Sequence, residues 1–190
     1  MRLIFVGPPG SGKGTQTQLL AQRLGLSQIG TGDMLREAVR LETPAGRRAK
    51  PFVAAGQLVP DDLVNEIVAH LFRIGSAPHD FVMDGYPRTL SQAQTFDKVL
   101  EQKTLPLDAV IFLNVADEEI IRRLGSRQRA DDQADIIRKR LEIFHAQNRD
   151  ILDYYRRKGL LVEVPGVGDV EAIYASIDQA LKDKIKKTKP

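Results

Sequence analysis

The sequence predicts an α/β fold: a three-layer sandwich in which a five-stranded parallel sheet carries helices on both faces. Short apolar runs alternate along the chain with longer segments of helical periodicity. The apolar runs are continuous in Val, Ile, Leu and Phe, which is typical of strands buried on both faces. A length of 190 residues, with 42% hydrophobic and 28% charged residues, suits one globular domain with a single core.

The expected elements follow in order from these patterns. Strands are expected at residues 3–6, 28–29, 81–83, 110–115 and 160–164. Helices are expected at residues 13–24, 32–41, 61–72, 91–100, 118–124, 132–157 and 170–184. Because no internal repeat and no linker rich in Ser, Gly or Pro divides the chain, we expect one domain over residues 1–190.

Cysteine is absent from the sequence, which excludes a disulfide framework, a zinc ribbon and a thiol nucleophile. The longest apolar runs fall well short of the ~20 residues of a membrane-spanning helix. The apolar run after Arg2 reaches Gly7 too soon for a signal peptide. These features predict a cytoplasmic protein with no membrane association.

The formal net charge of +3 comes from 28 basic and 25 acidic residues, so that bulk charge does not indicate a partner. Arginines crowd the segment 122–140, and lysines gather at the C-terminus in residues 182–189. The lysine run lacks interleaved aromatic residues and is typical of a solvated helix end. We therefore expect no nucleic-acid partner.

A glycine-rich segment, residues 7–15, lies between the first expected strand and the first expected helix. Its spacing, Gly7, four residues, Gly12 and Lys13, is that of a P-loop, whose backbone N–H groups wrap phosphate oxygens. Gly14 occupies the place of the usual Mg²⁺-binding hydroxyl, which arrives one residue later at Thr15. The residues predicted to bind ATP phosphates are Gly10, Ser11, Gly12, Lys13, Gly14 and Thr15.

Four motifs together resemble adenylate kinases, in the nucleoside monophosphate kinase family of P-loop kinases. They are the segment 7–15, the segment 31–36 (TGDMLR), the segment 84–89 (DGYPRT) with Gln92, and the arginines of residues 123–140. The motifs stand in the family's order over nearly the whole chain. The resemblance implies a P-loop NTPase-type fold and the reversible, Mg²⁺-dependent, in-line transfer of the γ-phosphoryl group of ATP to AMP, giving two ADP.

Phosphoryl transfer between two polyanions needs cations, and no general base is needed because a phosphate monoester has a second pKa of ≈ 6. The three histidines, His70, His79 and His145, accordingly belong to no catalytic set that the sequence reveals. We assign Arg36 and Arg88 to the acceptor phosphate, because a guanidinium binds phosphate through paired hydrogen bonds.

The remaining arginine roles are implied by the resemblance. Arg129 and Arg140 would face the acceptor and transferring groups, Arg123 would stabilise the moving charge, and Arg127 would cover the ATP side. The predicted catalytic residues are Lys13, Arg88, Arg123 and Arg140.

Asp84 ends a buried strand, where P-loop proteins carry the acid that holds Mg²⁺, here through water. The alternative for Asp84 is a turn or a helix cap. Asp33 is a weaker candidate for the same role, because it also fits a helix N-terminus. Asp131 and Asp132 would orient arginines, touch ribose or cap the helix that follows.

The resemblance also implies the nucleotide pockets. The ATP adenine would lie against the main chain near Gly168. Gln92 is the residue that we expect to read the adenine edge of AMP. The other residues predicted to line the AMP pocket are Thr31, Gln57, Leu58, Val59, Gly85, Tyr86, Pro87 and Arg88, besides Arg36, Arg129 and Arg140.

Within the single domain we expect a core of residues 1–29, 60–125 and 133–190, a monophosphate-binding helical insertion of residues 30–59, and a short lid of residues 126–132. A lid of this length has neither room nor ligands for zinc. Closure of both segments would expel water that otherwise competes as acceptor. The expected partners are ATP, AMP and ADP, and the expected state is a monomer.

Two alternatives remain open. A sibling kinase for UMP, CMP or GMP would share the P-loop and the arginines and differ around Thr31 and Gln92. A P-loop ATPase with a nucleic-acid-binding lysine tail would bind DNA or RNA with a steep salt dependence and have no use for Arg36.

Overall fold

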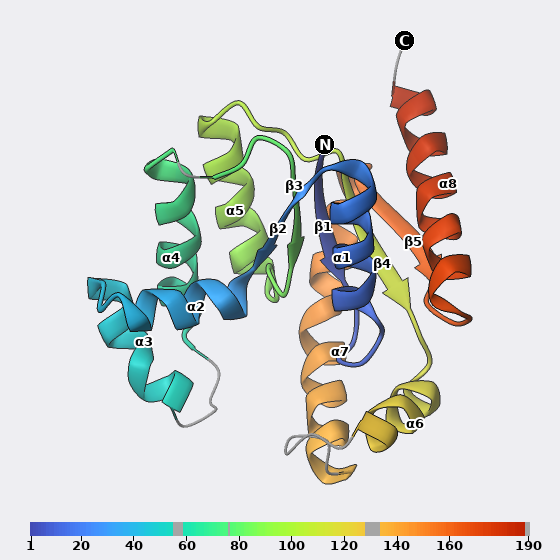
Figure 1. Ribbon diagram of the computed structural model, residues 1–190, viewed down its shortest axis with the longest axis horizontal. Helices are drawn as coiled ribbons and strands as arrows, with labels where there is room; N and C mark the ends of the chain where they lie inside the picture. The colour runs from blue at the N-terminus through green and yellow to red at the C-terminus, as the bar shows by residue number, and fades with distance from the viewer. Residues whose placement is uncertain (55–58, 76, 128–133, 189–190) are drawn as a thin grey trace.

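The computed structural model describes residues 1–54, 59–75, 77–127 and 134–188, which fold around one five-stranded parallel sheet (Figure 1). The strand order in the sheet is β2-β3-β1-β4-β5. The strands are β1 (Arg2–Val6), β2 (Ser27–Gly30), β3 (Phe81–Asp84), β4 (Ala109–Asn114) and β5 (Leu161–Pro165). Each expected strand is confirmed, close to its predicted bounds.

The helices flank the sheet or lie beyond its carboxyl edge (Figure 1). They are α1 (Lys13–Leu24), α2 (Thr31–Arg40), α3 (Pro44–Ala54), α4 (Asp61–Arg73), α5 (Leu90–Gln102), α6 (Asp117–Arg127), α7 (Ala134–Arg157) and α8 (Val170–Thr188). Apart from α3, each corresponds to an expected helix. The predicted start of the long helix at residue 132 lies outside the described residues.

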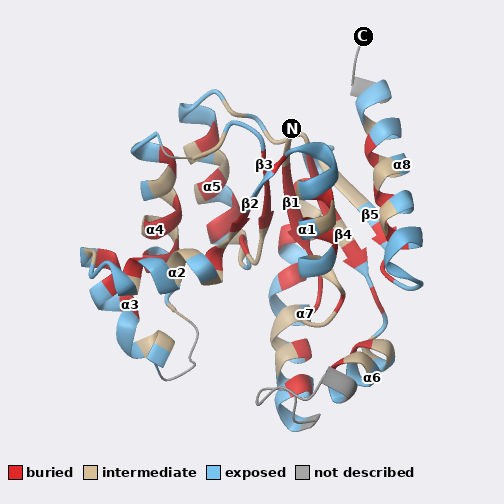
Figure 2. Cartoon of the chain, viewed as in Figure 1, coloured by how far each residue is buried: buried red, intermediate tan, exposed pale blue. Residues whose placement is uncertain are grey.

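Alternate side chains of β1 enter two separate cores. Leu3 and Phe5 pack with Leu20 of α1 and Ile177 of α8 on one face of the sheet. Ile4 and Val6 belong to the core of the other face, where α4, α5 and α7 contribute Val68, Phe96 and Tyr155 among others. The central strands are therefore buried on both sides, as Figure 2 shows, and the three-layer sandwich is confirmed.

The parallel register brings the segments that follow the strands to one edge of the sheet. Asp84 of β3 pairs with Phe5 of β1 and with Gly30 of β2, and Val6 pairs with Phe112 of β4. The glycine-rich loop, Thr31, Gly85 and the β4–α6 connection consequently start at the same edge, the lower one in Figure 1. In open α/β sheets this edge is where ligands bind.

The short helix α3 is the element that the sequence patterns did not delimit. Its start carries the ordinary signals, because Pro44 is its first residue and the Thr43 hydroxyl accepts a 2.9 Å hydrogen bond from the Gly46 N–H. Gly46 and Pro51 inside the helix lower its intrinsic helix propensity. Gly46 has a tertiary reason: a Cβ there would lie 1.8 Å from the Ala38 carbonyl oxygen of α2.

Helix α6 packs on α7 beside the glycine-rich loop. Ile120 and Leu124 of α6 form a small core with Ile137 and Leu141 of α7. A Cβ on Gly10 would lie 2.7 Å from Leu124 Cγ, so the loop rests directly on α6. Among the described residues, no helix is long and apolar enough to span a membrane.

Candidate functional site

The glycine-rich loop forms the floor of the candidate site. Gly10 and Gly12 have φ angles of +82° and +96°, a backbone conformation that favours glycine, and Gly12 is the residue before α1. The first N–H groups of α1 have no partner within the helix and carry the positive end of its dipole. This loop can therefore receive an anion at the start of α1.

Lys13 bends back over this loop. Its Nζ donates hydrogen bonds to the carbonyl oxygens of Gly7 at 2.7 Å and Pro8 at 2.8 Å, and lies 3.5 Å from Ser11 Oγ. Burial lowers the pKa of Lys13 to about 8; the Asp84 carboxylate opposes this shift, and the guanidinium groups of Arg88 and Arg140 add to it. The loop thus holds a lysine that is less basic than usual, with one carboxylate and two guanidinium groups nearby.

Asp84 stands opposite the first turn of α1. Its Oδ2 lies 3.8 Å from the position of a Cβ on Gly14, the position that carries a hydroxyl in the general P-loop pattern. The described residues contain no group of three acidic, His or Cys side chains able to hold a metal ion by themselves. A single carboxylate fits Mg²⁺ that arrives with a polyphosphate, because Mg²⁺ typically takes one or two carboxylates, substrate phosphates and water.

An open pocket of about 510 Å³ continues from the glycine-rich loop along α6. Gly168, predicted to lie beside the ATP base, is part of its wall, together with Val167, which is 59% exposed. Arg123 crosses this wall: its Nη2 donates to the Gly166 carbonyl oxygen at 3.0 Å. The predicted residues Gly10, Ser11, Gly12, Thr15, Arg123 and Gly168 all line this one pocket.

Glu119 is a site residue that the sequence reasoning missed. Its carboxylate accepts hydrogen bonds from Arg123 Nε at 2.6 Å and from Arg122 at 2.7 Å, and these bonds lower its pKa to about 2. Glu119 therefore remains ionised and orients Arg123 across the pocket. The signal was present in the sequence, because residues three and four apart on a helix are neighbours.

Gln16 was also missed. It is 2% exposed, its Nε2 donates to the Val170 carbonyl oxygen at 2.9 Å, and its Oε1 is buried without a partner among the described residues. This amide joins α1 to the start of α8, just after Gly168. The signal is a polar residue four positions before the buried Leu20, on the core-facing side of α1.

The residues predicted to surround AMP gather on the other side of Lys13, around Gly85. Thr31 is buried, and its hydroxyl donates to the Gly85 carbonyl oxygen at 3.2 Å. Arg88 Nε donates to the same oxygen at 2.7 Å. Arg88 is open to solvent on one side, yet the surrounding protein atoms lower its pKa, as expected for a guanidinium in a cleft. Gly85 itself has φ +81°.

Gln92 lies deeper than a freely accessible base-reading side chain. It is 3% exposed; its Oε1 accepts the Arg88 N–H at 2.6 Å, and its Nε2 donates to Asp61 Oδ1 at 2.7 Å. A carboxamide has two N–H donors and two acceptor sites, so one of each is not used by these two bonds. Asp61, which sequence reasoning used only as a helix start, fixes this amide.

Tyr86 faces away from the cleft. Its ring packs edge-on against Phe96 in the core, and its hydroxyl donates to Asn65 Oδ1 at 2.6 Å. Burial raises the pKa of this hydroxyl. The Tyr86–Pro87 peptide bond is cis. Contact between Tyr86 and a nucleotide is thus restricted to its main chain.

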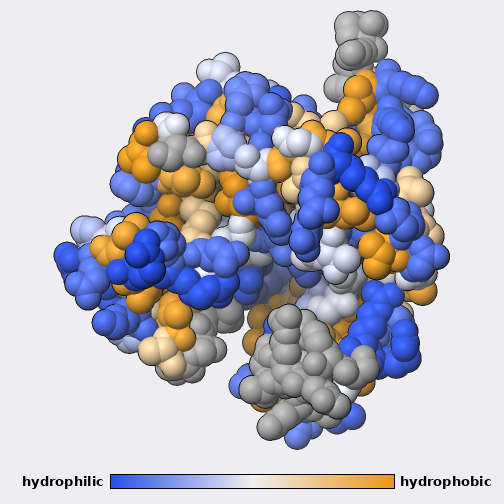
Figure 3. Space-filling model, viewed as in Figure 1, coloured by the Kyte–Doolittle hydropathy of each residue, from blue (hydrophilic) through white to orange (hydrophobic). Residues whose placement is uncertain are grey.

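Arg36, a predicted ligand of the acceptor phosphate, is exposed. Its side chain is 67% exposed, and its Nη2 lies 2.5 Å from Oδ1 of Asp33, whose side chain is 83% exposed. Asp33 therefore neutralises Arg36 and does not cap α2: the residue before that helix is Gly30, which has no side-chain cap. Figure 3 shows the surface hollowed between the lobe of α2 and α3 and the end of the molecule that carries α6.

Arg140 enters from α7 and is half-buried. It lies close enough to Lys13 and Arg88 to contribute to the lowered pKa of both. Val59 is half-buried beside the core of the insertion. Gln57, Leu58, Arg129, Asp131, Asp132 and the side chain of Arg127 lie outside the described part of the structure.

Comparison with known proteins gives one consistent result. The family model described as adenylate kinase matches residues 5–160. Among curated relatives, an adenylate kinase of Rhizobium meliloti (strain 1021) is 44% identical over 191 residues, covering 95% of this chain and all of the relative. Adenylate kinases of Thermodesulfovibrio yellowstonii and Archaeoglobus fulgidus are 37% and 36% identical, covering 97% and 98% of this chain and all of each relative.

Proposed function

Since this chain belongs to the adenylate kinase family, we propose that the P-loop and the arginines at the carboxyl edge of its sheet carry out the family's reaction. The chain is an ATP:AMP phosphotransferase. In this proposal, different residues bind ATP, align AMP and neutralise the charge on the transferred group.

One observation carries the assignment: three cations from three elements meet beside the glycine-rich loop. Lys13, Arg88 and Arg140 come from α1, the β3–α5 connection and α7, and the two arginines contribute to the lowered pKa of Lys13. Asp84 offsets only part of this charge. Such an excess of positive charge is unfavourable by itself and favourable around a polyphosphate.

On the ATP side, the phosphates take the place of the carbonyl contacts that Lys13 makes in the free enzyme. The N–H groups of residues 10–15 surround the β-phosphate, and Lys13 moves onto the β- and γ-phosphates. The adenine lies against Val167 and Gly168, because an exposed apolar side chain beside open main chain suits a flat ring. Arg123 and Arg127 meet the polyphosphate from α6.

On the AMP side, arginines hold and align the acceptor. Arg36 leaves Asp33 and, with Arg88, binds the AMP phosphate, while Arg129 and Arg140 bridge the acceptor and the transferring group. The AMP oxygen attacks directly, since it is already ionised near neutral pH. Thr31, residues 57–59 and residues 85–88 line the pocket, and the second N–H of Gln92 reads the adenine edge.

Asp84 holds Mg²⁺ through water molecules, at the end of β3. When bound with ATP, the metal ion would supply positive charge that offsets the charge developing on the phosphates during transfer. Asp84 also keeps Lys13 protonated more readily than burial alone would allow. No zinc is part of this site.

The insertion of residues 30–59 and the short lid of residues 126–132 close over the two nucleotides, while residues 1–29, 60–125 and 133–190 form the core. The alignment with the Archaeoglobus relative runs over 217 residues, so that relative has residues that this chain lacks, which supports a shortened form. Closure excludes water as a competing acceptor. In that case the enzyme hydrolyses ATP in the absence of AMP far more slowly than it transfers the phosphoryl group to AMP. Equal rates of the two reactions would refute the proposed closure of the insertion and the lid.

The enzyme acts as a cytoplasmic monomer on ATP, AMP and ADP, without nucleic acid or a membrane. The lysines near the C-terminus support the absence of a nucleic-acid partner, because Lys182 pairs with Asp178 on α8 and burial lowers the pKa of Lys184. Light scattering of the purified chain tests the monomer. Binding to DNA or RNA that weakens steeply with salt would instead favour the ATPase alternative.

The direct test of the function is a coupled assay of ADP formation with AMP, UMP, CMP and GMP as acceptors. We expect AMP to give the highest kcat/KM, by about tenfold or more, because hydrogen bonds between the enzyme and the adenine edge would be lost with another base. Arg40→Ala serves as a folded control that leaves the assigned residues intact. Preference for a pyrimidine nucleotide would favour the sibling kinase.

A further inference from the structure

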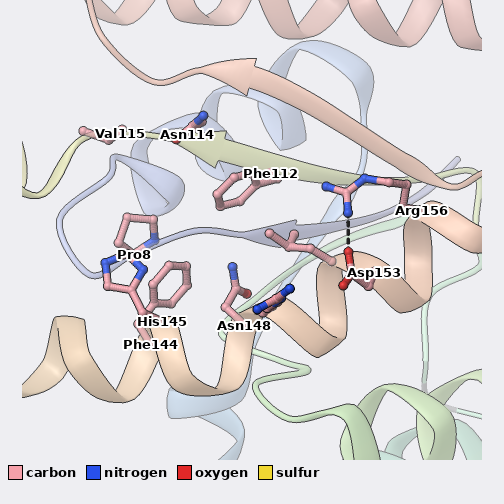
Figure 4. A pocket seen from close by; sticks show the side chains of 11 residues that line it. Pro8, Phe112, Asn114, Val115, Phe144, His145, Asn148, Asp153 and Arg156 are labelled. Carbon is pink, nitrogen blue, oxygen red and sulfur yellow. Dashed lines mark hydrogen bonds and ion pairs between the residues drawn. The ribbon is translucent and has the colours of Figure 1, made fainter.

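A second pocket, of about 250 Å³, lies on the α7 side of the sheet, behind the start of the P-loop (Figure 4). Pro8, the end of β4 and the middle turns of α7 form its walls. Among the described residues, none of those assigned to ATP or AMP lines it. The pocket is therefore lined by other residues than those assigned to phosphotransfer.

Asn148 provides the main evidence for a ligand. Six polar side chains are buried among the described residues, and five of them make hydrogen bonds with the protein. Asn148, which is 5% exposed, makes none with any residue that the structure describes. Its amide extends from α7 into the pocket, toward β4 (Figure 4). Among the described residues the enclosed, unpartnered side-chain atom is Gln16 Oε1, so the polar atoms of the Asn148 amide are open to the pocket, where a ligand can bond to them.

The charges around the pocket favour an anion. Arg156 is held by Asp153 and lies 2.8 Å from Glu163, so its charge is offset. His145 lies 2.9 Å from Asp117. Arg149, the residue after Asn148, forms no ion pair within the described part of the chain. Its guanidinium is the uncompensated charge of this wall, and a guanidinium binds carboxylate or phosphate through paired hydrogen bonds.

The shape and the aromatic lining favour a single flat ring. Phe112 of β4 and Phe144 of α7 extend into the same space as Asn148 (Figure 4). Pockets for drug-sized ligands measure roughly 300–1,000 Å³, so a 250 Å³ pocket suits one ring more than a whole nucleotide. A ring that contacts phenyl faces and pairs with a carboxamide must carry donors and acceptors on its edge.

We propose that this pocket is a binding site for a single heteroaromatic ring that carries an anionic group. Asn148 pairs with the ring edge, Phe112 and Phe144 contact its faces, and Arg149 binds the anionic group. The ligand also touches Pro8, whose carbonyl oxygen accepts a hydrogen bond from Lys13, so the site is adjacent to the P-loop from behind.

Orotate, a pyrimidine ring with one carboxylate, is a suitable probe. Calorimetric titration of the full chain in magnesium-free buffer with saturating ADP keeps the nucleotide sites filled and prevents turnover. We expect orotate to bind with a Kd of about 1 mM or tighter, which is the range for a ligand of this size. Uracil, which lacks the carboxylate, and benzoate, which lacks the polar ring edge, should each bind about tenfold more weakly.

Three variants assign the binding to this pocket. Asn148→Leu and Arg149→Gln should each weaken orotate binding by about tenfold, while Arg157→Gln, an exposed arginine on the same helix outside the pocket, should not change it. Arg149 is exposed, so its variant remains informative even if Asn148→Leu lowers stability. The proposal would be overturned if no binding is detected at an orotate concentration of about 10 mM, or if wild type and Arg149→Gln bind orotate equally.

Discussion

The two proposed nucleotide sides of the cleft differ in what holds their cations before substrate arrives. On the ATP side, Lys13 donates to two main-chain carbonyl oxygens of its own loop, and Arg123 donates to a third on the β5–α8 connection. On the AMP side, Arg36 is held only by the exposed side chain of Asp33 among the interactions that the structure describes. Lys13 and Arg123 are thus held by main-chain carbonyl oxygens of the loops that follow β1 and β5, as Arg88 is by the Gly85 carbonyl oxygen, whereas Arg36 is held by one exposed ion pair.

This difference separates residues that position the reacting phosphates, Lys13 and Arg123, from Arg36, which binds incoming AMP. Lys13 and Arg123 bond to main-chain carbonyl oxygens beside the glycine-rich loop, close to where the phosphates are proposed to bind, so their loss should affect the chemical step. An exposed ion pair is worth only about 0–1 kcal/mol, so Arg36 can exchange Asp33 for a phosphate at little cost. Its loss should affect binding of AMP.

The largest effect should follow from Lys13→Met. We expect kcat to fall about a thousandfold, because a buried cation that stabilises the developing charge is removed. The melting temperature should be unchanged or higher, since burial disfavours the charged lysine in the free enzyme. Steady-state kinetics and circular dichroism measure both; a kcat within tenfold of wild type would break the comparison.

The next effect should come from Arg36→Ala. We expect the KM for AMP to rise about tenfold to hundredfold while the KM for ATP stays constant, as for the loss of charge-assisted hydrogen bonds. Arg40→Ala is the matched control, because Arg40 lies on the same helix and pairs with Glu37 at the same spacing and distance. If the two variants behave alike, Arg36 has no special part in capturing AMP.

A pH profile sharpens the comparison without mutation. With a pKa of about 8, Lys13 of the free enzyme loses its proton as the pH rises, so kcat/KM for ATP should fall about fivefold between pH 8 and 9. The kcat, which reports the bound state, should stay flat, because the polyphosphate retains the proton. At saturating ATP, kcat/KM for AMP should also stay flat, because arginines remain charged. A parallel decline in both kcat/KM values would contradict the separation of the two sides.

The same shift has a consequence for stability. Between pH 8 and the ordinary lysine pKa of 10.5, the unfolded chain binds more protons at this residue than the folded chain. The contribution of Lys13 to the free energy of unfolding therefore rises with pH across this interval.

The smallest effects should come from the helix caps. Thr43→Ala removes the cap of α3. Asp169→Ala removes the cap of α8, in which Asp169 Oδ1 accepts the Ala172 N–H at 2.7 Å. Each should lower the free energy of unfolding by about 1 kcal/mol and the melting temperature by roughly 2–4 °C. Thr43→Ala should raise only the KM for AMP, and Asp169→Ala only that for ATP; the reverse assignment would exchange the two sides.

Much of the fold was predictable because the strands are apolar throughout and the P-loop marks the first strand–helix junction. Once the sheet is parallel, the segments after β1, β2 and β3 must share an edge, so Lys13, Thr31 and Asp84 could be brought together from their places in the sequence. That inference needs no side-chain detail, only the direction of the strands.

The side-chain directions and long-range partners within that edge could not be predicted. Tyr86 stands inside the DGYPRT motif, yet its ring joins the core, where its hydroxyl meets Asn65. The amide of Gln92 is fixed by Asp61, on another helix. Helix α3 was not predicted, because Gly46 lowers its helix propensity. Gly46 is required by the close approach of α2, a tertiary contact that no local sequence pattern reveals.

The contact between α2 and α3 has a thermal consequence. The buried side chains that these two helices provide to their core are Ala38, Ala45 and Ala49, and their larger apolar side chains there are only partly buried, whereas the sheet is lined by buried Leu, Ile, Phe and Tyr. Each buried methylene contributes about 0.8 kcal/mol, so this lobe gains far less from burial than the sheet does. On warming, we expect the lobe to loosen first, and the enzyme to stop working at a temperature below that at which its sheet melts.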